Sequence, residues 1–93
     1  MLKVNEYFDG NAKSIAFQTA DLPATVGVIS PGEYEFGTTK KEVMTVISGA
    51  LEVLLPGMDK WMTYGAGETF EVAGQASFKA KADVDTAYLC TYE

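Results

Sequence analysis

The chain has 93 residues, which allows one domain with a modest hydrophobic core. Seven lysines against thirteen aspartates and glutamates give a net charge of −6, and the sequence contains no arginine and no histidine. These counts exclude imidazole metal ligands, a histidine general base and a guanidinium fork for phosphate. They also argue against binding to nucleic acid or to an anionic membrane surface, because both need clustered cations.

Alternating apolar and polar residues run through most of the chain, and helical periodicity is nearly absent. Glycine, proline and other turn residues interrupt the alternation at the short spacing typical of a β-sandwich or barrel. The segment 5–10 is aromatic but irregular, and we expect it to lie across the barrel or against a neighbouring subunit. The remaining pattern predicts about nine short strands, at residues 14–18, 25–29, 33–36, 43–48, 50–55, 61–64, 69–72, 76–82 and 86–92.

The single cysteine, Cys90, cannot form an internal disulfide, which suits a reducing compartment. It lies in an apolar predicted strand without a base partner, so we expect a buried and inert thiol. The N-terminal residues lack the apolar run of a signal peptide, and no apolar stretch is long enough for a transmembrane helix. We therefore expect a cytoplasmic location.

Two sequence frames resemble the two motifs of the cupins. Glu42 is followed by six residues and then Gly49, with a predicted strand on either side of the glycine. The second frame starts at Gly67 and runs through a strand to Ala73 and Gly74. The resemblance implies an all-β, cupin-type jelly-roll barrel that forms a single domain over residues 1–93.

Many cupins bind a metal through histidines and the glutamate of these motifs. The first histidine pair would fall near Phe36 and Thr38, and the last histidine at Ala76 or Ser77. Only Glu42 keeps its identity, and one carboxylate does not make a transition-metal site. We therefore expect no metal and no cofactor.

The whole chain is similar to the small bacterial pyrimidine/purine nucleoside phosphorylases, which are one-domain cupins. The resemblance implies an enzyme of the pentosyltransferase class of glycosyltransferases that converts a purine or pyrimidine nucleoside and inorganic phosphate, reversibly and without metal, into free base and ribose 1-phosphate. One departure is Ala73, where proline usually precedes Gly74. The segments that carry the resemblance are 5–8 (NEYF), Ser14, 26–28 (VGV), 32–36 (GEYEF), 44–56 (MTVISGALEVLLP), 88–90 (YLC) and Tyr92.

Phosphorolysis passes through a sugar cation and needs phosphate held below the ring. Without arginine, the richest candidates for phosphate binding are hydroxyl and ammonium groups just before Glu42, namely Thr38, Thr39, Lys40 and Lys41. The alternative is a solvated turn. Glu42 points into a cupin barrel by its motif position, where we expect it to contact ribose hydroxyls or stabilise the cation; the alternative is a structural carboxylate paired with a lysine or a tyrosine.

Several apolar and hydroxyl side chains are candidates for contact with the nucleoside. Met44 shares the face of Glu42 by alternation and would line the cavity floor. Phe36, Phe70, Phe78 and Tyr88 offer rings on which a purine or a pyrimidine can stack, and the alternative is that they are ordinary core aromatics. Ser77 lies near the missing histidine position, where it either donates a hydrogen bond or ends a strand.

Two other functions fit the same fold. One is a non-catalytic cupin that binds a sugar or a nucleotide, and the other is a structural or regulatory dimer with a filled cavity. A metal-dependent cupin is nearly excluded by the absence of histidine. In each case we expect a homodimer, because dimerisation adds core and covers exposed sheet that 93 residues leave open.

Overall fold

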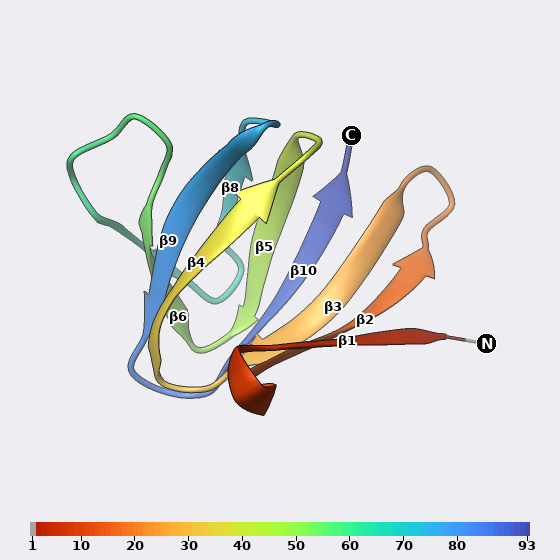
Figure 1. Ribbon diagram of the computed structural model, residues 1–93, viewed down its shortest axis with the longest axis horizontal. Helices are drawn as coiled ribbons and strands as arrows, with labels where there is room; N and C mark the ends of the chain where they lie inside the picture. Colours follow the sequence, from red (N-terminus) through yellow and green to blue (C-terminus); the bar gives the residue numbers. More distant parts are fainter. Residues whose placement is uncertain (1) are drawn as a thin grey trace.

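A computed structural model describes residues 2–93, and over this range the chain forms ten strands and one 3-10 turn (Figure 1). The elements, in chain order, are β1 Lys3–Tyr7, η1 Phe8–Gly10, β2 Ala12–Gln18, β3 Pro23–Ile29, β4 Gly32–Thr38, β5 Glu42–Ser48, β6 Ala50–Leu54, β7 Met62–Gly65, β8 Thr69–Val72, β9 Ala76–Ala82 and β10 Thr86–Tyr92.

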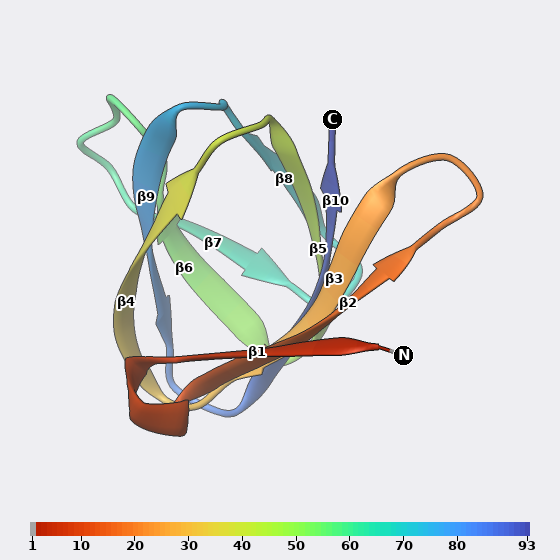
Figure 2. The same cartoon turned by 45° about the vertical axis from the view of Figure 1, so that its right-hand side comes forward.

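The strands form two sheets that face each other (Figure 2). The larger sheet has six strands in the order β1-β2-β3-β10-β5-β8, and the smaller sheet has four in the order β4-β9-β6-β7. Every pair of neighbouring strands is antiparallel. The sheets do not close into one continuous barrel, but the all-β prediction is confirmed.

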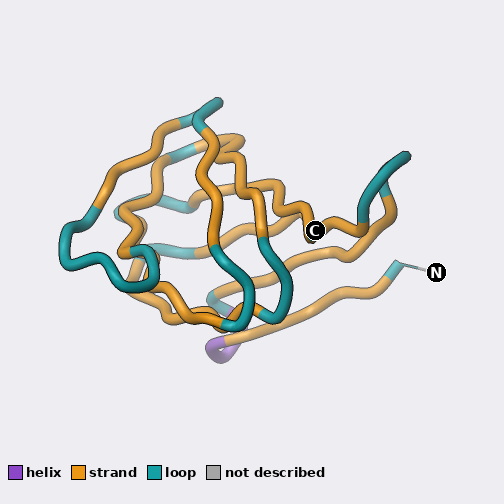
Figure 3. The backbone as a smooth tube through the Cα atoms, turned by 90° about the horizontal axis from the view of Figure 1, so that it is seen from above, coloured by secondary structure: helices purple, strands orange, loops and turns teal. Residues whose placement is uncertain are grey.

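The six-stranded sheet is wider than its partner. The start of β1 and the hairpin between β2 and β3 project beyond the four-stranded sheet, as Figures 1 to 3 show from three directions. The inner face of this projecting part therefore has no second sheet above it.

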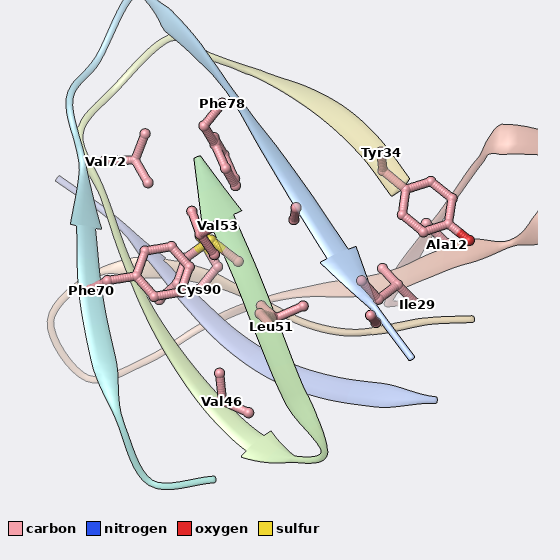
Figure 4. Close-up of a cluster of buried hydrophobic side chains, with 13 residues drawn as sticks. Ala12, Ile29, Tyr34, Val46, Leu51, Val53, Phe70, Val72, Phe78 and Cys90 are labelled. Atoms are coloured by element: carbon pink, nitrogen blue, oxygen red, sulfur yellow. The ribbon is translucent and has the colours of Figure 1, made fainter. Parts of the chain in front are cut away.

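The core lies between the sheets, and alternation along the strands builds it (Figure 4). In β9 the apolar residues Phe78, Ala80 and Ala82 are buried, whereas Lys79 between them is exposed. Val53 from β6 and Val72 from β8 are both fully buried. Burying an aliphatic side chain of this size contributes about 1.5–3 kcal/mol, so such pairs hold the two sheets together.

The hairpin between β5 and β6 turns at Gly49, as the cupin-like frame after Glu42 predicts. Gly49 has φ +88°, a left-handed conformation that favours glycine. A Cβ atom at this position would also lie 2.5 Å from Thr86 Oγ1. That hydroxyl donates to the carbonyl oxygens of Ala50 (3.2 Å) and Val84 (3.0 Å), which ties the hairpin to β10.

All nine predicted strands are present, with ends that differ by at most a few residues from the predicted ones. The prediction for the N-terminus was wrong in one respect. Residues 3–7 are not irregular, because they pair with β2 in regular register, with Val4 opposite Ile15 and Tyr7 opposite Ala12. The irregular part is confined to η1. In residues 2–93 no helix has the length and apolar composition needed to cross a membrane.

Candidate functional site

A cavity of about 250 Å³ lies between the two sheets. Strands of both sheets and η1 contribute to its wall. Its apolar lining residues are Phe8, Ile29, Phe36, Gly37, Met44, Leu51, Phe78 and Ala80. Its polar lining residues are Asn5, Tyr7, Ser14, Thr25, Glu35, Glu42, Tyr88, Cys90 and Tyr92.

Antiparallel register brings the polar lining residues together from distant parts of the chain. Asn5 lies opposite Ser14, Ser14 opposite Gly27, and Gly27 opposite Tyr88, so one row crosses four strands. Side chains of a cross-strand row project on the same face of a sheet, and here that face is the one turned to the cavity. Asn5 Nδ2 lies 3.4 Å from the Ser14 hydroxyl oxygen and donates to it.

Glu42 lies at the start of β5, directly opposite Tyr92 at the end of β10. The Cys90 thiol donates a hydrogen bond to Glu42 Oε1, with 3.4 Å between sulfur and oxygen. Burial raises the pKa of the Glu42 carboxyl above its usual value, and the thiol hydrogen bond opposes this increase. The carboxyl therefore holds its proton to higher pH than an exposed glutamate does.

The sequence predicts no base partner for Cys90, and the structure places the Glu42 carboxyl within hydrogen-bond distance of the thiol. The prediction of a buried thiol is confirmed. Burial, together with the nearby Glu42 charge, raises the pKa of the thiol to about 12. At neutral pH the group is a protonated donor, and it is a poor nucleophile because reactivity belongs to the thiolate.

Two tyrosines of β10 complete this part of the wall. The Tyr88 ring lies against the backbone of Gly27, where a Cβ atom would be 2.5 Å from the ring carbon Cζ. Burial raises the pKa of the Tyr88 hydroxyl to about 12. The Tyr92 hydroxyl lies 3.0 Å from Thr25 Oγ1, and burial raises its pKa as well. Both phenols are therefore neutral hydrogen-bonding groups at neutral pH.

Aromatic rings gather at the other end of the cavity. The Phe8 ring lies with its centroid 5.0 Å from that of Tyr34 and 5.6 Å from that of Phe36, edge to face in the second pair. Phe36 in turn stacks on Phe78 at 5.6 Å. The cavity thus has a polar end around Glu42 and an aromatic end around Phe8.

The structure divides the predicted site residues into two groups. Four of them line the cavity, namely Phe36, Glu42, Met44 and Tyr88. Phe78, which we considered as a stacking ring, lines it as well. Six others do not line it, namely Thr38, Thr39, Lys40, Lys41, Phe70 and Ser77.

Local contacts explain why this second group lies elsewhere. The buried Thr38 hydroxyl donates to the Ala73 carbonyl at 2.7 Å. Lys41 Nζ lies 3.1 Å from the Glu71 carboxylate. Thr39, Lys40 and Ser77 are exposed, and Phe70 stacks on Tyr64 at 4.6 Å. A role for these residues in substrate binding stays a prediction.

Sequence reasoning missed six polar or aromatic residues of the lining, namely Asn5, Tyr7, Phe8, Ser14, Thr25 and Tyr92. Three of them belong to β1 and η1, whose path was not predicted, and Ser14 begins the predicted strand 14–18. The one usable signal was the aromatic pair at positions 7 and 8, two residues before Gly10. Glu35 is exposed and also lines the cavity.

The residues at the cupin metal positions do not fit a metal. Phe36 presents a ring, and the Thr38 hydroxyl is occupied by the Ala73 carbonyl. Within residues 2–93, no three side chains of aspartate, glutamate and cysteine come together in a metal-binding arrangement. Glu42 has the Cys90 thiol beside it rather than further carboxylates.

The two-sheet architecture with an internal cavity defines a cupin-type protein. An RmlC-like cupin from Shewanella frigidimarina has the same fold, with a TM-score of 0.76 at 20% identity over 98% of this chain and 82% of that one. A crystal structure of a Vibrio parahaemolyticus protein of unknown function gives a TM-score of 0.96 at 46% identity, over 100% of this chain and 99% of that one. The predicted cupin-type fold is therefore confirmed.

The sequence comparison is more specific. The family model for pyrimidine/purine nucleoside phosphorylase matches residues 2–92. A Marinobacter nauticus protein that carries this name is 75% identical over 92 residues, which cover 99% of each chain. The chain belongs to the pyrimidine/purine nucleoside phosphorylase family.

Proposed function

We propose that this protein is an enzyme that catalyses the reversible phosphorolysis of purine and pyrimidine nucleosides, giving free base and ribose 1-phosphate. The observation that carries the proposal is the family match over nearly the whole chain. It is supported by a cavity large enough for part of a nucleoside, with hydroxyls and a carboxyl at one end and aromatic rings at the other. In enzyme-class terms this is a pentosyltransferase, within the glycosyltransferases.

We place the ribose at the polar end. In the reaction, the bond from the anomeric carbon to the base nitrogen breaks, and its electron pair leaves with the base. A phosphate oxygen then forms the new bond to that carbon. Glu42 would accept hydrogen bonds from the ribose hydroxyls and, when ionised, stabilise the sugar cation. The donor Cys90 and the Thr25–Tyr92 hydroxyl pair would hold this end in shape.

Phosphate binding needs positive charge from outside the cavity lining, because no lysine of the described residues lines the cavity. We infer that phosphate binds where the cavity meets the loop of residues 39–41, next to Glu42. Thr39 and Lys40 are exposed there. Lys41 pairs with Glu71 and would have to exchange that partner to take part.

The proposal needs no metal and no cofactor other than phosphate as co-substrate. The expected absence of a metal rests on the sequence, which has no histidine. Its test is activity that survives a chelator. We also propose a cytoplasmic location, because a single free cysteine suits a reducing compartment.

The decisive experiment is an assay with uridine and adenosine, with and without phosphate and in the presence of a chelator. We expect phosphate-dependent release of free base and ribose 1-phosphate. Glu42→Gln should lower kcat/KM by roughly a hundredfold or more, the size seen when one transition-state contact is lost. The matched control is Glu33→Gln, an exposed carboxylate of β4 that does not line the cavity.

Folding should not confound this assay. Burial raises the pKa of Glu42, so its ionised form disfavours the folded state as pH rises through that pKa. Glutamine removes the charge, and Glu42→Gln should unfold at the same temperature as the wild type or higher. Wild-type protein that releases no base from any nucleoside would rule out the proposed reaction.

A sugar- or nucleotide-binding protein without catalysis is the second candidate. The observation that favours it is the lining itself, which offers hydroxyls, carboxyls and aromatic rings, whereas no lysine of residues 2–93 lines the cavity. Nucleoside binding without turnover in the assay above would select this function.

We further propose that the protein is a homodimer joined through the outer face of the six-stranded sheet. Val4, Ile15, Val26 and Leu89 lie side by side in one row across this face. Val4, Ile15 and Val26 are exposed, as are Val28 and Ile47 on the same side. Contiguous exposed apolar surface of this kind marks an interaction site, and an isologous contact between two copies would cover it.

A further inference from the structure

The turn between β1 and β2 has an unusual backbone. Phe8 has φ 55° and Asp9 has φ 57°, and Gly10 follows with φ 87°. Three successive residues therefore adopt left-handed conformations, two of them with side chains. For a bulky residue such as phenylalanine this conformation is a genuine outlier, and strain of this kind clusters at ligand sites.

A chain of hydrogen bonds through Asn11, Ser30 and Tyr34 fixes the turn. The Asn11 side-chain amide donates to the Phe8 carbonyl at 2.9 Å, and the Asn11 backbone N–H donates to the same oxygen at 3.1 Å. The Ser30 hydroxyl donates to Asn11 Oδ1 at 3.0 Å. Tyr34 donates to the Ser30 carbonyl at 2.9 Å. This chain of contacts links the strained turn to the start of β4.

The turn places the Phe8 ring at the cavity rather than in the core. The ring lines the cavity and contacts Tyr34 and Phe36 of the four-stranded sheet. Figure 2 shows η1, at the end of β1, next to the start of β4 in that sheet. Phe8 nevertheless remains 42% exposed. A ring that served packing alone would be stabilised more by full burial. Partial burial of Phe8 therefore does not by itself explain why its backbone is strained.

We propose that Phe8 is a nucleobase-contacting residue, which with Phe36 forms an aromatic subsite for the base at the end of the cavity opposite Glu42. Strand β4 runs from Tyr34, beside Phe8, toward the loop that precedes Glu42, so the two ends are separated along one strand. An aromatic face stacks on purines and pyrimidines alike, which suits a broad base range. The inference rests on the proposed function and specifies its base subsite.

The test compares Phe8→Ala, Phe8→Leu and Phe8→Tyr with a control, Phe17→Ala. Phe17 lies on β2, is half-buried and does not line the cavity. We expect Phe8→Ala to raise the KM for uridine and adenosine by about tenfold to a hundredfold, the range for one lost stacking contact. The KM for phosphate should stay within about twofold of the wild-type value.

Phe8→Leu separates stacking from simple filling of space. Leucine keeps apolar bulk but has no aromatic face, so it should behave like alanine, whereas Phe8→Tyr should restore the wild-type KM. Asn11→Ala, which loses the side-chain bond to the Phe8 carbonyl, should raise the nucleoside KM in the same direction. Equal KM values for wild type, Phe8→Ala and Phe8→Leu would overturn the inference.

A binding measurement distinguishes failure of this inference from failure of the proposed reaction. Titration of wild type and Phe8→Ala with free adenine and uracil, followed by NMR, needs no turnover. Loss of base binding in Phe8→Ala supports the subsite even if the wild type shows no phosphorolysis. Turnover by the wild type with unchanged base binding in Phe8→Ala refutes the subsite alone, and a wild type that shows neither turnover nor base binding refutes both.

Discussion

Glu42 and Cys90 form a carboxyl–thiol pair inside a cavity that also holds two neutral phenols. The groups that face Glu42 are Cys90, Tyr88 and Tyr92 of β10, and no lysine of the described chain lines the cavity. Burial and the absence of a cation both favour the protonated carboxyl, and only the thiol donor acts in the opposite direction. We therefore expect Cys90 to act as a positioning residue, whose thiol donates to the Glu42 carboxyl and favours its ionised form.

Replacing Cys90 should change the titration of Glu42. In Cys90→Ala the donor is lost, so the pKa of Glu42 should rise further, and the acid limb of kcat/KM against pH should move to higher pH. Cys90→Ser keeps a donor, and its hydroxyl donates more strongly than a thiol, so its profile should stay closer to the wild type than that of Cys90→Ala. The shift is measured by the pH–rate profile and, independently of activity, by carbon NMR of the Glu42 carboxyl.

Comparison of the two variants removes the effect of packing, because both replace the thiol with a smaller group. A general loss of rate without a shifted profile in Cys90→Ala would show that the thiol only fills space. A profile that moves to lower pH would contradict the donor role assigned to Cys90.

At the scale of elements, the pairing of β3 with β10 depends on a glycine. Gly27 leaves room for the Tyr88 ring, and Gly27→Ala would place Cβ 2.5 Å from both Cζ and the hydroxyl oxygen. The ring has to turn into the cavity, so we expect nucleoside affinity to fall at least about tenfold. Because the cavity offers space, the free energy of unfolding should fall by only about 1–2 kcal/mol.

Urea denaturation and nucleoside titration check this outcome. Gly37→Ala is the control for stability, since a Cβ at Gly37 meets no atom within 4 Å. Unchanged nucleoside affinity in Gly27→Ala would mean that Tyr88 does not shape the site.

Strand positions could be predicted because each strand carries its own alternation and ends at its own turn residues. The position of Glu42 on the cavity face followed from its place in the cupin-like motif, and alternation then put Met44 on the same face. The partner of Glu42 could not be predicted, because Cys90 is 48 positions away and the contact depends on register between β5 and β10. The path of β1 was missed because the adjacent aromatics Tyr7 and Phe8 break the alternation that marks a strand. In the structure, Tyr7 ends β1 and Phe8 begins the left-handed turn.

At the scale of the whole molecule, the exposed apolar row on the outer face of the six-stranded sheet predicts a homodimer. Val26 lies in the middle of the exposed apolar row, between Ile15 and Leu89. Val26→Lys should leave the fold intact, because the side chain is exposed, and should convert a dimer into a monomer. Sedimentation velocity at matched concentrations measures the change.

The control for this experiment is Val84→Lys, since Val84 is also exposed but lies in the turn between β9 and β10. If both lysine variants sediment like the wild type, or if the wild type itself is a monomer, this face is not the dimer interface.

The cavity wall takes residues from β1, at one end of the described chain, and from β10, at the other. No half of the chain contains the site, so a ligand recognises only molecules in which both termini are docked. Occupancy is then coupled to global unfolding: a ligand at a hundred times its Kd adds about 2.7 kcal/mol to the stability of the native state. The midpoint of thermal unfolding, measured against ligand concentration, therefore reports occupancy of the cavity. It can be measured for any nucleoside, base or sugar phosphate, whether or not the protein converts that ligand.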